Sequence, residues 1–103
     1  MSYVLGNLVK QAVLSITLSP AEILANTSAE QTFIVNGLQA GDHVVVNKPT
    51  AQAGLDIANV RAGTNALYVT FGNFTAAGIT PTAAEVYSVL VSRPDRTITD
   101  GIF

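Results

Sequence analysis

The stretch GLQAGDHVVVNKPTAQAGLDI, residues 37–57, holds the only histidine of the chain, His43, together with Asp42, Lys48 and Asp56. An imidazole beside a carboxylate can bind a metal ion or serve as a general base. One histidine and one adjacent aspartate supply at most two metal ligands, and their spacing fits no metal-binding motif. The sequence therefore predicts a structural position for His43 at the start of a strand, with no metal site.

Other catalytic chemistries are also disfavoured by the residues present. A serine hydrolase would need His43 as its base, and the chain has no Gly-x-Ser-x-Gly elbow. A glycosidase would need a pair among Asp42, Asp56 and Glu85, and each of these lies beside a turn or a strand end, where a solvated side chain is expected. Lys48 precedes Pro49 in a turn, so we expect an exposed lysine and no isopeptide link.

No cofactor site is expected either. The glycines do not follow the Gly-x-Gly-x-x-Gly spacing of a phosphate-binding loop, so they are interpreted as turn residues. We therefore expect no catalytic residue, no cofactor and no enzymatic activity. A small enzyme remains as an alternative that depends on His43 alone.

The composition points to a partner. The 103 residues make one domain, with 49% hydrophobic and only 12% charged residues, whereas charged residues average about 25% in typical domains. With so few charged residues, the chain cannot easily cover its whole surface with polar groups. We therefore expect part of the apolar surface to face another chain.

Charge and segment patterns exclude other partners. The net charge is −2 and no run of Lys or Arg is present, which argues against nucleic-acid binding. The absence of cysteine excludes disulfides. Residues 1–22 match a signal peptide only weakly, because polar residues interrupt the apolar run. Residues 62–84 are uncharged but contain Gly and Pro, as strands and turns do, so no membrane segment is expected.

Alternating apolar residues predict strands over residues 12–18, 31–36, 43–47, 55–61, 66–71 and 85–92. The Val44-Val45-Val46 run predicts a strand covered on both faces. Gly72-Asn73 is interpreted as a bulge or kink, after which Phe74 and Thr75 could resume a strand. Residues 21–30 are predicted to be a loop.

These elements predict an all-β fold: an antiparallel β-sandwich or jelly-roll-like domain of six to eight short strands. The expected organisation is an N-terminal arm over residues 1–11, the β-sandwich domain over 12–93 and a C-terminal tail over 94–103. The tail, RTITDGIF, could add a short edge strand.

Four segments taken together carry a family resemblance: EQTFIVNGL (30–38), AGDHVVVNKPT (40–50), GLDIANVRAGTNALYVTF (54–71) and ITPTAAEVYSVLV (79–91). Over about residues 16–92 the chain resembles small virion proteins of tailed bacteriophages, of the capsid decoration (cement) or head-fibre type. The resemblance is one of pattern and composition and includes no catalytic motif.

The resemblance implies a structural protein that is made in the host cytoplasm and decorates the virion as a homotrimer bound to the major capsid protein. Contacts with the shell or with neighbouring copies are expected from both terminal segments, at Tyr3, Val4, Leu5, Leu8, Ile98, Ile102 and Phe103. The alternative is a head- or tail-fibre module that binds a host receptor or glycan through an exposed face, with Tyr68 and Tyr87 as candidates.

Overall fold

The structure is a computed structural model, and it describes residues 8–95. These residues form six strands and no helix, and every strand pairing is antiparallel. The strands are β1 (Leu8–Leu18), β2 (Thr27–Ile34), β3 (His43–Asn47), β4 (Leu55–Gly63), β5 (Ala66–Asn73) and β6 (Glu85–Pro94). The prediction of an all-β antiparallel fold is confirmed.

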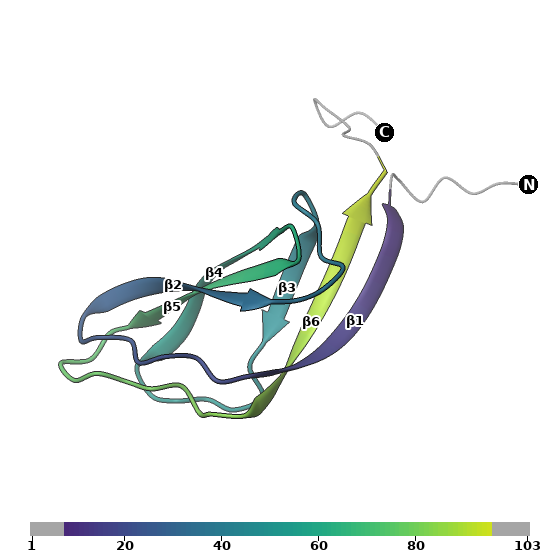
Figure 1. Ribbon diagram of the computed structural model, residues 1–103. Coiled ribbons are helices and arrows are strands. Elements are labelled where there is room, and N and C mark those ends of the chain that lie inside the picture. The colour runs from purple at the N-terminus through teal and green to yellow at the C-terminus, as the bar shows by residue number, and fades with distance from the viewer. Residues whose placement is uncertain (1–7, 96–103) are drawn as a thin grey trace, which may run out of the picture.

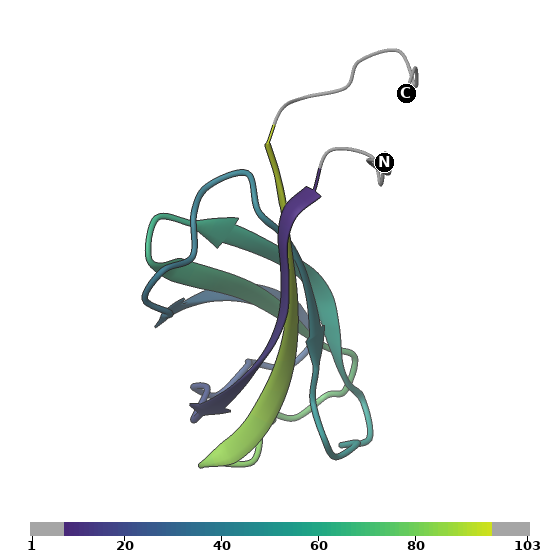
Figure 2. The ribbon, with the colours of Figure 1, turned by 90° about the vertical axis from the view of Figure 1, so that its right-hand side faces the viewer.

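The strands form two three-stranded sheets, with the orders β1-β6-β3 and β2-β5-β4. Only β4 and β5 form a tight hairpin, which turns at Thr64-Asn65 with Asn65 at a φ of 53°. In Figure 1 the strands of the first sheet run across the direction of the strands of the second. The view in Figure 2 shows β1 and β6 in front of the second sheet, so the two sheets form separate layers in a sandwich-like arrangement.

The two central strands supply the middle of a single core. Side chains alternate between the two faces of a strand, so Leu67, Val69 and Phe71 of β5 all point inward, and each is fully buried. On β6 the same alternation buries Tyr87, Val89 and Val91, and both sets belong to one cluster. β3 lies beside β4 and joins the two layers along one side.

A buried asparagine organises the end of β5. The Asn73 amide nitrogen donates to the carbonyls of Ile23 and Ala77, at 3.0 and 2.8 Å, and its oxygen accepts from the backbone N–H and hydroxyl of Thr75. Because every polar atom of this side chain is satisfied, its burial carries little desolvation cost. The chain therefore leaves the sheet at Asn73, and Phe74 and Thr75 do not resume a strand.

The strand boundaries differ from the sequence prediction at several ends. β3 spans the predicted residues, whereas β1 begins at Leu8, inside the segment expected to be an arm. β2 begins at Thr27 rather than residue 31, because Thr27 and Ser28, expected in a loop, pair with Asn73 and Gly72 of β5. Both differences arise from pairing with a distant strand, which in β2 overrides the local turn preference of Thr27 and Ser28.

Candidate binding surface

Three of the residues that suggested chemistry, Asp42, Lys48 and Glu85, form ion pairs at the ends of the core. Asp42 was expected to be a solvated turn residue, and this is wrong: its side chain is 1% exposed and forms a bidentate ion pair with Arg93, with both N···O distances at 2.8 Å. The carboxylate also accepts a hydrogen bond from the Gln39 N–H at 2.9 Å. Asp42 therefore ties the loop before β3 to the end of β6.

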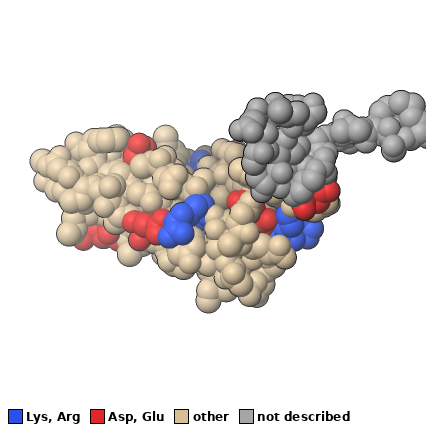
Figure 3. Space-filling view, turned by 90° about the horizontal axis from the view of Figure 1, so that it is seen from above, with Lys and Arg blue, Asp and Glu red and all other residues tan. Residues whose placement is uncertain are grey.

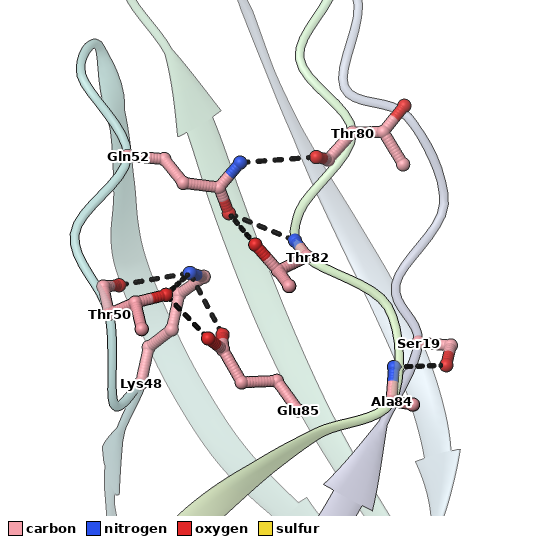
Figure 4. A network of polar contacts seen from close by, with 8 residues as sticks. All are labelled: Ser19, Lys48, Thr50, Gln52, Thr80, Thr82, Ala84 and Glu85. Carbon is pink, nitrogen blue, oxygen red and sulfur yellow. Dashed lines mark hydrogen bonds and ion pairs between the residues drawn. The ribbon is translucent and has the colours of Figure 1, made fainter.

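Lys48 and Glu85 make the equivalent closure at the opposite end of β6. Their charged atoms are 3.0 Å apart and their side chains are only 10% and 9% exposed, so the predictions of an exposed Lys48 and a solvated Glu85 are wrong. Thr50 donates its hydroxyl to Glu85, and Lys48 donates to Thr50 (Figure 4). The Thr50 hydrogen bond and the Lys48 charge together hold the pKa of Glu85 below its ordinary value.

Further bonds in Figure 4 connect the neighbouring loops. Gln52 bonds both the Thr80 carbonyl and the Thr82 N–H, while Ser19 accepts from the Ala84 N–H. These contacts join the segment after β3 to the segment before β6. The network is therefore a structural brace, and its polar groups bond to one another.

His43 begins β3, as predicted, and is exposed. It lies beside Ser92 of β6. Within residues 8–95 no group of three His, Cys, Asp or Glu side chains is arranged to hold a metal ion. Tyr87, a candidate for an exposed recognition face, is 0% exposed, so this prediction is wrong; Tyr68 lies beneath the Arg61 guanidinium, 3.9 Å from its ring centre.

The outer face of the β1-β6-β3 sheet is the second feature of interest. Strand register places Val13, Leu90 and Val45 in one row across the three strands. Polar, uncharged residues flank this row: Gln11, Ser92 and His43 on one side, and Ser15, Ser88 and Asn47 on the other. No Asp, Glu, Lys or Arg stands in these three rows, which we call the neutral face.

The neutral face carries apolar side chains that the described chain does not cover. Val13 is 68% exposed and Val45 is 55% exposed. The expectation that the strand 43–47 is covered on both sides is therefore wrong within residues 8–95, since only the face with Val44 and Val46 packs on the core. Apolar rows with a polar surround are typical of protein interaction sites.

The edge of β1 continues the neutral face. β1 is an edge strand of 11 residues, and Lys10 is its only charged residue. Long edges without repeated charges or prolines are prone to pair with another chain. In the view from above (Figure 3) the charged side chains stand in small groups within a mostly uncharged described surface.

The predicted contact residues fall largely outside the described residues. Leu8 is the first residue of β1, is 46% exposed and lies opposite Pro94. Outside the described residues lie Tyr3, Val4, Leu5, Ile98, Ile102 and Phe103. The neutral face itself was not predicted as a site. A signal for it was present, because residues 44–46 and 86–91 carry apolar side chains on both faces of their strands.

No family model, curated protein or solved structure matches this chain. Residues 8–95 contain no helix long and apolar enough to cross a membrane.

Proposed function

We propose that this chain is a structural protein of a tailed-bacteriophage virion, which attaches as a homotrimer to the shell of major capsid protein. The observation that carries the proposal is the neutral face, an uncharged sheet surface with an exposed apolar row. Copies of the chain assemble by covering this face. The terminal segments with Tyr3, Val4, Leu5, Ile98, Ile102 and Phe103 contact the shell.

Physical properties of the face support assembly between copies. A face without charges can be desolvated without stranding an unpaired charge, which is the most costly event in burying polar surface. Covering the row Val13, Leu90 and Val45 removes apolar surface from water, at about 25 cal/mol per Å². The braced core with its two ion-paired ends keeps the sheet rigid, so little conformational entropy is lost on association.

The attachment role draws on the resemblance of residues 16–92 to decoration proteins. Such a protein occupies many equivalent positions on a shell, so a weak contact per copy is multiplied by the oligomer. The ion pairs Asp42–Arg93 and Lys48–Glu85 stabilise the core, and a stable core suits a protein with a structural role.

A charge placed in the neutral face should dissociate the oligomer. Val13→Asp puts a carboxylate into the apolar row, where its desolvation opposes association. We expect light scattering coupled to size-exclusion chromatography to give a trimer for the unchanged chain and a monomer for Val13→Asp, with association weakened at least about tenfold.

The matched control is Ile34→Asp. Ile34 is an exposed apolar strand residue, 81% exposed, on the other sheet. This variant is expected to remain trimeric. A monomeric unchanged chain, or equal dissociation of both variants, would contradict assembly through the neutral face.

Shell attachment is tested separately. Deleting residues 2–7 leaves β1 complete, so the truncated chain should keep the trimer and lose co-sedimentation with undecorated heads of the phage that carries the gene. Undiminished co-sedimentation would show that the N-terminal segment is not the attachment site. If the full chain also failed to bind, the virion role itself would be rejected.

A further inference from the structure

The outer face of the β2-β5-β4 sheet, opposite the neutral face, holds a groove of about 380 Å³. It crosses the end of the sheet, where register aligns Ser28, Gly72 and Asp56. Its lining comes from the start of β2, the first half of β4, the end of β5 and the residues next to β2 and β5, namely Asn26, Thr27, Ser28, Asp56, Ala58, Gly72, Asn73 and Phe74.

A β-bulge in β4 sets the groove's composition. The register shifts between Ile57 and Asn59, so Ala58 is the extra residue. The bulge allows Asp56 and Arg61 to point outward while Ile57 and Val60 face the core. Asp56 is thereby brought to the groove on the same face as Arg61.

Two side chains of opposite character meet above Gly72. A Cβ atom on Gly72 would lie 2.4 Å from Asp56 Oδ1 and 4.0 Å from the tip of the Phe74 ring. The absence of a side chain at Gly72 therefore makes the space that the carboxylate occupies. Asp56 forms no hydrogen bond or ion pair within residues 8–95, and Phe74 is 72% exposed.

The same sheet face contains an occupied version of this arrangement. Arg61 lies over the Tyr68 ring at 3.9 Å and donates two hydrogen bonds to Glu30, at 2.9 and 2.8 Å. An aromatic ring and a carboxylate thus hold a guanidinium from this chain. Asp56 and Phe74 offer the same two groups, with no cation of this chain bound to them within residues 8–95.

We propose that the Asp56–Phe74 groove binds an arginine side chain of a protein partner. The carboxylate accepts the guanidinium N–H groups, and the ring face attracts the delocalised charge. Asn26 and Ser28 line the rim with amide and hydroxyl groups that suit the remaining donors. The partner's arginine would repeat the contacts that Arg61 makes with Tyr68 and Glu30.

The expected affinity for a single side chain is low. Exposed ion pairs and cation–π contacts are each weak in water, so an isolated arginine should bind only at millimolar concentration. Binding becomes tight only when many copies engage a partner together. The groove lies on the sheet opposite the neutral face, so both surfaces can be used at once.

The test uses the nitrogen-15-labelled full chain and N-acetyl-arginine methylamide. The amide resonances of Asp56, Gly72 and Phe74 are expected to shift and to saturate during the titration. Asp56→Asn and Phe74→Leu should each weaken binding about fivefold, because each removes one of the two contacts. The control Asp95→Asn removes a carboxylate just after β6, in the other sheet, and should bind like the unchanged chain.

Two further ligands separate the chemical classes. The citrulline analogue has nearly the same shape without the charge and should leave the three resonances in place. Glucose tests whether the groove instead takes a saccharide. No shift with the arginine analogue, equal binding of citrulline, or stronger binding of glucose would each overturn the assignment.

Discussion

Replacing Asp42 with alanine should lower the free energy of unfolding by about 3 kcal/mol, because the change leaves Arg93 without its buried partner. The Asp42 side chain is 1% exposed, and Arg93 is 17% exposed. Arg93 keeps its bond to the Gly37 carbonyl at 2.8 Å, while the Gln39 N–H loses its acceptor. Urea denaturation followed by circular dichroism measures the loss.

Glu30→Ala is the matched control for this prediction. Glu30 and Arg61 form an ion pair with the same donor geometry, but their side chains are 36% and 54% exposed. Solvent screens such a pair, so Glu30→Ala should move the denaturation midpoint little. If Asp42→Ala and Glu30→Ala lowered the free energy of unfolding equally, burial would not explain the strength of the Asp42–Arg93 pair.

The same pair should make stability depend on acidity. The Arg93 hydrogen bonds hold the pKa of Asp42 below its ordinary value of 3.8. The ion pair's contribution is therefore complete above that value and is lost as the pH falls through the lowered pKa. The melting temperatures of the unchanged chain and Asp42→Ala should converge as the pH falls below about 4. A constant difference between them would contradict the assigned shift.

Tyr87→Phe is expected to remove an alkaline loss of stability of about 2–3 kcal/mol. Tyr87 is 0% exposed, and burial, with a smaller effect of the Glu85 charge, raises its pKa to about 12 from 10.0. Above pH 10 the unfolded chain releases this proton while the folded chain retains it. Stability is therefore lost between pH 10 and about 12.

The neutral-pH outcome is equally specific. The Tyr87 hydroxyl oxygen has no hydrogen-bond partner within residues 8–95. Removing an unsatisfied buried hydroxyl should leave stability unchanged or raise it by about 1 kcal/mol. Tyr68→Phe retains Tyr87 and should keep the alkaline loss. If Tyr87→Phe kept that loss, another group would be its source. If the variant destabilised the chain at pH 7, the hydroxyl would have to be hydrogen-bonded in the folded state.

Local sequence signals predicted the strands that have strong boundaries. β3 was predicted over its full length because Gly41-Asp42 and Lys48-Pro49 bracket an apolar run. The start of β2 was missed because Thr27 and Ser28 read locally as a turn. Their strand conformation depends on hydrogen bonds to β5, a segment more than forty residues away in the sequence.

The candidate sites show a comparable division. Apolar residues at successive positions, as in Val44-Val45-Val46, indicated a second surface to be covered. Only the strand order β1-β6-β3 reveals that Val13, Leu90 and Val45 form one row. Likewise, Asp56 could be noted as a carboxylate, but its meeting with Phe74 above Gly72 required the pairing of β4 with β5.

The sequence by itself determined an all-β chain, the side-chain face of most strand residues and a shortage of charge. These properties follow from period-two alternation, turn residues and composition, all of which are local or additive. The tertiary structure decided which strands are neighbours, and therefore the environment of each charge. Asp42 meets Arg93 across 51 residues, so burial converts an apparent turn residue into a structural ion pair.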